Sequence, residues 1–134
     1  MGPKKGQVAP LVNNDLLAST KGCIPKTISV SAEAVGFGDD GIMPLGTVLV
    51  LATSGDDEGL YREHDDADAG GEGLGDEATA VVLAHNIEQG EAVDGKIKAA
   101  AYIAGVLKAD KLLVNDAENF DWDKCPRLIR WPLG

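Results

Sequence analysis

The stretch that decides the fold is Pro44-Leu45-Gly46-Thr47-Val48-Leu49-Val50-Leu51-Ala52-Thr53. Its centre is a run of valine and leucine with no polar side chain between Thr47 and Thr53. Successive side chains of a strand point to opposite faces of a sheet, so a strand without a polar face is covered on both sides. We therefore expect a two-sided sheet with this strand at its centre and with these core residues: Val48, Leu49, Val50 and Leu51.

Weaker strand signals flank this stretch on both sides. The run 78–84 (Ala-Thr-Ala-Val-Val-Leu-Ala) predicts a second buried strand, with Val81, Val82 and Leu83 in the core. Alternation over 27–32, an island at Tyr61, period two over 96–107 and the run Arg127–Trp131 predict further strands. Asp94-Gly95 is a hairpin signal, and 108–123 reads as short helical or irregular structure. Together they predict a mainly β fold with minor α: a small, compact, barrel-like domain.

The first 27 residues differ from the rest. They contain Pro3, Pro10 and Pro25, only short apolar runs, and four lysines against a single aspartate. Each proline removes a backbone donor and leaves little room for a helix. We expect an extended N-terminal arm over 1–27 and a β-rich domain over 28–134.

Residues 55–77 are strongly acidic, with ten carboxylates and one arginine. The string from Asp66 to Glu77 resembles a calcium-binding loop, but glycine stands at the fifth ligand position and no helices flank it. The glycine content is typical of a solvated loop. We expect this acidic loop to face solvent, with no metal and no catalytic duty.

Composition excludes several classes of function. The chain of 134 residues has 22 acidic and 12 basic residues, a net charge of −10, which disfavours direct binding to nucleic acid or to an anionic membrane. Cys23 and Cys125 fit neither a disulfide framework nor a zinc pattern. His64 and His85 have no recognisable nucleophile motif beside them, and Gly36–Gly41, although it reads GxGxxG, leads into a strand and not a helix. We expect no catalytic residues, no metal and no cofactor.

Three segments in order carry a resemblance to a known family. They are Pro44-Leu-Gly-Thr-Val-Leu-Val-Leu-Ala-Thr53, Ala78-Thr-Ala-Val-Val-Leu-Ala-His-Asn-Ile87 and Ala104-Gly-Val-Leu-Lys-Ala-Asp-Lys-Leu112. In this order they resemble the lambda-type head decoration proteins of tailed bacteriophages, over about residues 44–131 and excluding the acidic loop. Leu128-Ile129-Arg130 can supply the short final apolar strand of that family. The acidic insertion and the C-terminal Trp131-Pro-Leu-Gly134 depart from the family pattern.

The resemblance implies a non-enzymatic capsid decoration protein. Such a subunit forms homotrimers on the outer surface of the expanded phage head, at local three-fold sites, and cements the major capsid protein against DNA pressure. Its place is the virion, after synthesis in the host cytoplasm. The arm would bind the capsid, an arrangement that β-augmentation can provide, through its apolar residues: Val8, Pro10, Leu11, Val12, Leu16, Leu17 and Ile24.

Two other readings compete with this one. The chain is alternatively an intracellular non-enzymatic protein-binding module that uses the arm for another partner. The other alternative is a small hydrolase or metal-dependent enzyme that uses the carboxylates of 64–77. No catalytic constellation in the sequence supports this interpretation.

Overall fold

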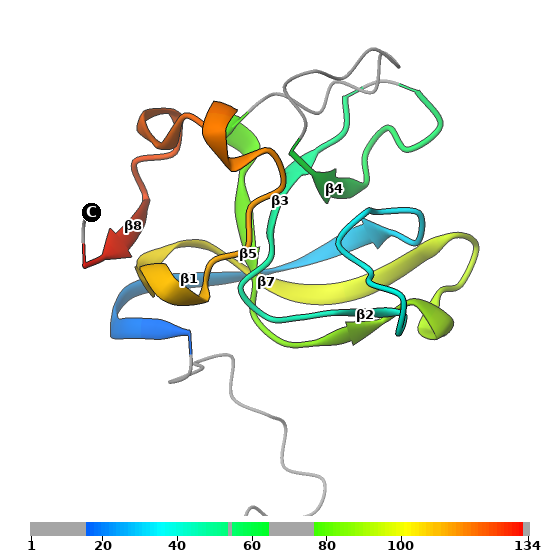
Figure 1. Cartoon of the computed structure of the whole chain (residues 1–134), viewed down its shortest axis with the longest axis horizontal. Coiled ribbons are helices and arrows are strands. Elements are labelled where there is room, and N and C mark those ends of the chain that lie inside the picture. The colour runs from blue at the N-terminus through cyan, green and yellow to red at the C-terminus, as the bar shows by residue number, and fades with distance from the viewer. Residues whose placement is uncertain (1–15, 54, 65–76, 133–134) are drawn as a thin grey trace, which may run out of the picture.

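The structure, a computed structural model, describes residues 16–53, 55–64 and 77–132. Over these residues it is a β protein with five single-turn 3₁₀ helices and no longer helix (Figure 1). The strands are β1 (Leu17–Ser31), β2 (Ile42–Met43), β3 (Val48–Leu51), β4 (Tyr61–Glu63), β5 (Val81–Leu83), β6 (Ile87–Glu88), β7 (Lys96–Lys108) and β8 (Leu128–Trp131). The 3₁₀ helices are η1 (Glu77–Thr79), η2 (Gln89–Glu91), η3 (Ala109–Lys111), η4 (Ala117–Asn119) and η5 (Trp122–Lys124). The predicted mainly β class with minor helix is confirmed.

Five of the strands form one closed ring. β4, β3, β5, β7 and β1 are neighbours in that order, all antiparallel, and β1 returns to β4 through a parallel pair of Val30 with Tyr61. The ring is the barrel-like sheet that the sequence predicts. β8 lies outside the ring, parallel to the end of β7, and β2 pairs with β6 in a separate two-stranded sheet.

The two longest strands, β1 and β7, pair with each other and run side by side across the molecule (Figure 1). β7 starts directly after a tight turn in which Val93 and Lys96 exchange backbone hydrogen bonds. Asp94 and Gly95, the two central residues of this turn, both have positive φ, as a type I′ hairpin requires. The predicted hairpin turn is therefore confirmed.

Residues on the two faces of this sheet form two separate cores. Val48 and Val50 pack into one, with Tyr102 and Leu107, whereas Leu49 packs into the other. In β5 the same alternation sends Val82 to the first core and its neighbours Val81 and Leu83 to the second. Six of the seven predicted core residues are buried, and Leu51 is half-buried at the end of β3. The predicted two-sided burial of β3 is confirmed.

A register shift in β7 explains why Tyr102 and Leu107, five residues apart, share a core. Gly105 has a φ of +150°, and a Cβ there would lie 3.4 Å from both Cα and Cβ of Cys23 on the adjacent β1. Close by, the pairing of β1 with β7 shifts between the pairs Pro25 with Tyr102 and Ile24 with Ala104, which leaves Ile103 as an extra residue in β7. An extra residue of this kind turns the following side chains to the opposite face. Beyond this extra residue, Leu107 therefore points into the first core.

The predicted boundary of the N-terminal arm is wrong. β1 begins at Leu17, so residues 17–27 belong to the sheet, and Leu16 and Leu17 are core residues with 0% and 5% exposure. Pro25 is accommodated because it lies at an irregular point of the pairing, where a missing N–H is tolerated. Over residues 1–15 the predicted arm lies outside the described residues.

Among the described residues there is no helix with the length and apolar character that crossing a membrane requires.

Candidate functional site

The three sequence segments that carry the resemblance meet at Gly46. Its N–H donates to the carbonyl of Leu83 at 2.8 Å, and its own carbonyl accepts from Leu113 N at 3.0 Å. Its φ is +90°, and a Cβ at this position would collide with the backbone carbonyl of Lys111. A glycine is required on both counts, because only glycine combines this φ with so close an approach of another backbone.

The bonds around Gly46 continue on each side of it. Thr47 O accepts from Leu83 N at 2.9 Å, and Val48 N donates to Leu113 O at 2.9 Å. The Thr47 hydroxyl donates to Pro44 O at 2.7 Å and closes the turn that leads into β3. The first segment is therefore joined to the second and to the chain that follows the third by backbone hydrogen bonds.

Two polar residues of the second segment, His85 and Asn86, complete this junction. Ala100 N donates to Nε2 of His85 at 3.1 Å, which places the ring proton on Nδ1, where it is donated to Asn86 O at 3.0 Å. The side-chain oxygen of Asn86 accepts from Leu45 N at 2.8 Å. Both side chains are thus hydrogen-bonded to backbone groups of the fold, and neither is free to act as a catalytic group.

The seven predicted arm residues do not form one surface. Val8, Pro10, Leu11 and Val12 lie outside the described residues, and Leu16 and Leu17 are buried in the first core. Ile24 alone of the described three is exposed, by 44%.

A different apolar surface lies on the C-terminal strand. β8 turns Leu128 into the first core, and Arg130 lies over the ring of Trp122 at 4.7 Å. The alternating residues Ile129 and Trp131 are exposed by 45% and 59%. No sequence-based expectation named this surface, although Ile129 and Trp131 at period two in a strand, with Arg130 between them, are the available signal.

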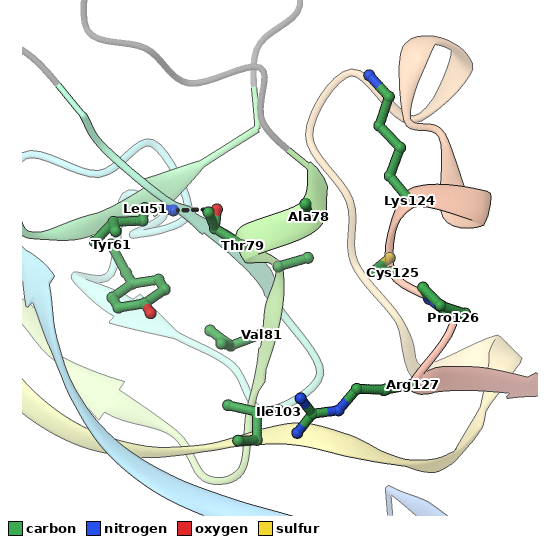
Figure 2. Close-up of a pocket in the computed structure, with 11 residues that line it drawn as sticks. Leu51, Tyr61, Ala78, Thr79, Val81, Ile103, Lys124, Cys125, Pro126 and Arg127 are labelled. Carbon is green, nitrogen blue, oxygen red and sulfur yellow. Dashed lines mark hydrogen bonds between the residues drawn. The ribbon is translucent and has the colours of Figure 1, made fainter.

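A hollow of about 290 Å³ opens between β5 and the chain that enters β8 (Figure 2). Its apolar wall comes from Leu51, Tyr61, Val81 and Ile103, and Arg127 stands at its rim. Figure 2 shows the Tyr61 ring and the Arg127 guanidinium directed toward Val81 and Ile103. Its lining includes no carboxylate, in contrast to the acidity of the chain as a whole. Such a surface suits an apolar or aromatic group with an electron-rich face.

Residues of the predicted acidic loop are buried at both of its ends, so the expectation that all of 55–77 faces solvent is wrong. The buried residues are Asp57, Glu63, His64 and Glu77. Residues 65–76, which include Asp66 and Asp68 of the calcium-like string, lie outside the described residues. Glu77, the last ligand of that string, is enclosed in the fold.

His64 and Glu77 lie against each other, with Nε2 and Oε2 3.3 Å apart. Glu77 Oε2 also accepts from Asp121 N at 3.0 Å, and Lys124 Nζ lies 3.5 Å from Oε1. Burial alone would raise the Glu77 pKa, but the hydrogen bonds from its own and the Asp121 N–H groups, with the charges of Lys124 and His64, hold that pKa below its ordinary value. The carboxylate is therefore ionised inside the protein.

The surroundings of His64 are structural. Its ring meets Phe120 edge-on at a centroid distance of 5.0 Å, and Asn115 donates from Nδ2 to His64 O at 2.8 Å. The side chain is fully buried, so the imidazole has no path to a substrate in solvent. The pair fastens the segment 115–124 to the end of β4.

A second ionic cluster fastens β4 itself. Arg62 is paired with Asp57 and, at 3.2 Å, with Glu63, and it donates to Glu33 O at 3.1 Å. Glu63 Oε1 in turn accepts from Val35 N at 2.9 Å. Burial lowers the pKa of Arg62, and the two carboxylates outweigh this and raise it, which keeps the guanidinium charged. The cluster holds the loop with Asp57 and the loop with Glu33 and Val35 against β4.

Cys125 is not an activated nucleophile. Burial, assisted by the negative charge of Glu77, raises the pKa of its thiol to about 11, so it is protonated at neutral pH. Over the described residues, no group of three or more His, Cys, Asp or Glu side chains is placed to hold a metal ion.

No protein-family model matches the chain, and neither a curated protein nor a solved structure matches it.

Proposed function

We propose that this chain is a capsid decoration protein. It would bind as a homotrimer to the outer surface of an expanded phage head, contact the major capsid protein at local three-fold sites, and stabilise the head against the pressure of packaged DNA. It acts without catalysis or a cofactor, and it stays on the virion.

The observation that carries the proposal is the junction at Gly46. Three short segments of common residues resemble the decoration family only through their order, and each segment by itself is weak support. In the structure the first two segments are joined by backbone hydrogen bonds of Gly46, Thr47 and Leu83, and Leu113, which directly follows the third segment, donates to Gly46. The resemblance therefore concerns a connected structural unit.

The placement of the N-terminal residues also supports the proposal. Leu16 is anchored, because its carbonyl accepts from Lys108 N at 2.8 Å, and fifteen residues precede it. Those fifteen residues include the apolar run Val8–Val12 and two lysines of an otherwise acidic chain. A segment of this length can offer backbone donors and acceptors to the edge of a sheet on a partner.

Co-sedimentation with expanded heads tests this function. The heads are assembled from the major capsid protein encoded in the same genome, and unexpanded proheads serve as the control. We expect saturable binding to expanded heads, with three copies per local three-fold site at saturation. Equal and unsaturable binding to both kinds of particle, or no binding to either, would contradict the proposal.

A further inference from the structure

The indole of Trp131 is a candidate interaction surface on β8. It is the larger of the two exposed apolar side chains of β8, and 59% of it is accessible. Its neighbour in the pairing, Lys108 of β7, keeps it at the end of a hydrogen-bonded strand. An indole held on a rigid strand loses little side-chain entropy on binding, which is why tryptophan is frequent at the centres of interfaces.

The hollow beside β5 has the complementary properties. Its volume of about 290 Å³ is at the lower limit of pockets that enclose small molecules, which is a space for one bicyclic side chain. Leu51, Val81 and Ile103 give it apolar surface, Thr79 and Lys124 add polar groups to its lining, and the guanidinium of Arg127 offers a cation to the face of an aromatic ring. The Tyr61 hydroxyl is an acceptor suited to an indole N–H. Charge and shape both favour an aromatic occupant.

The Trp131 side chain of the same chain is placed away from this hollow. Arg127 lies in the turn before β8, and Trp131, which is not part of the lining, is the last residue of that strand, at most about 13 Å further along the chain at ~3.3 Å per residue. The projecting group and the hollow are thus separate parts of one surface. A contact between such unlike parts of identical chains is heterologous, and it closes into a ring when the rotation between copies permits.

We propose that Trp131 of one copy inserts into the hollow of the next copy, between Tyr61 and Arg127, and that three such contacts close the ring. This inference rests on the proposed function, because the homotrimer is part of it, and it adds the contact that makes the trimer. Ile129 packs beside the inserted indole. The hollow surface and the exposed face of β8 are then both buried in the assembly.

Sedimentation equilibrium on three single variants and the wild type tests the contact. Trp131→Ala removes the projecting group, Ile103→Trp fills the hollow, and Val93→Ala is the matched control at a side chain with 69% exposure. We expect the wild type and Val93→Ala to be trimers. We expect Trp131→Ala and Ile103→Trp to be monomers, with association weakened at least about 30-fold, as for loss of a central aromatic anchor.

Mixing the two defective variants gives the sharper result. Trp131→Ala retains an open hollow, and Ile103→Trp retains the indole of Trp131. A single intact contact can therefore form between the two variants, and the expected product is a 1:1 dimer without trimers. Thermal melts check the fold of each variant, and Ala78→Trp replaces Ile103→Trp if the latter is unfolded. Trimers of Trp131→Ala at wild-type strength would overturn the contact, as would a wild type that is monomeric at all concentrations.

Binding to expanded heads is measured on the same samples and separates the two proposals. Normal binding by a protein that assembles without Trp131 refutes the contact and leaves the proposed function in place. Trimers that follow the expected pattern but ignore expanded heads support the contact and refute the capsid role.

Discussion

The Glu77 carboxylate lies 3.3 Å from the imidazole Nε2 of His64, and both side chains are buried, with twelve residues of sequence between them. This contact brings together the end of β4 and the start of η1. It also reaches the C-terminal half of the chain, through Asp121 and Lys124. The two ends of a strongly acidic segment are in this way built into the hydrophobic domain.

Glu77→Gln is expected to destabilise the protein by about 3 kcal/mol at pH 7, because it removes the buried partner of His64 and Lys124. The pKa of Glu77 is lowered in the folded state, so its contribution is complete above the ordinary carboxyl pKa and is lost as pH falls through the lowered one. Urea unfolding at pH 7, 5, 4 and 3 measures the difference between variant and wild type. We expect the difference to shrink at pH 4 and below. The control is Glu118→Gln at an exposed position, with a change within about 0.5 kcal/mol. A difference that does not vary with pH would show that the ionised carboxylate is not what stabilises this region.

Gly46→Ala is expected to cost at least about 3 kcal/mol, since a Cβ there meets the carbonyl of Lys111 and the φ of +90° is also unfavourable. Gly95→Ala separates the two effects. Its φ is +79° but its surroundings are open, so about 1 kcal/mol is expected. Gly90→Ala, with an open site and no positive φ, is expected to be neutral. Chemical denaturation of the three variants gives the ranking, and equal losses at Gly46 and Gly95 would refute the close approach.

Leu49→Ala is expected to lower the free energy of unfolding by about 2–5 kcal/mol, because the side chain has 0% exposure in the second core. Val93→Ala, at an exposed apolar position, is the control and is expected to change it by less than about 0.5 kcal/mol. Equilibrium unfolding in urea measures both. A loss under about 1 kcal/mol for Leu49→Ala would mean that β3 is not covered on that face.

Two truncations distinguish the observed start of the sheet from the predicted one. Removal of residues 1–15 leaves β1 whole, so we expect a melting temperature close to that of the full chain together with weaker attachment to expanded heads. Removal of residues 1–27 takes away Leu16, Leu17 and most of β1, and we expect loss of the folded state. Circular dichroism melts of both truncated proteins show whether each one is folded. A well-folded 28–134 fragment would restore the predicted boundary, and unimpaired attachment of the shorter truncation would exclude the N-terminal segment from capsid binding.

The sequence predicted the parts of the fold that depend on local pattern. β3 and β5 are apolar on both faces, and Asp94-Gly95 has the residues that a tight hairpin requires, so each was identifiable without tertiary information. The arm boundary was not, because Pro25 and Gly22 are typical of loops. Their place in β1 depends on an irregular pairing with β7, in which Pro25 meets Tyr102.

The candidate surfaces were less predictable for a related reason. His64 and Glu77 look like loop residues because their neighbours are acidic and glycine-rich, and their burial results from Phe120, Asp121 and Lys124. The hollow likewise joins residues of β3, β4, β5 and β7 with the chain before β8. Sets of this kind arise from the closure of the barrel and leave no signal in any single stretch of sequence.

Cryo-electron microscopy of expanded heads incubated with an excess of the purified full-length chain tests the central claim most directly. The account predicts added density on the outer surface at every local three-fold position, in the shape of three copies of the barrel around each axis, and absent from heads incubated without the protein. Bare local three-fold positions on expanded heads at saturating protein would contradict it.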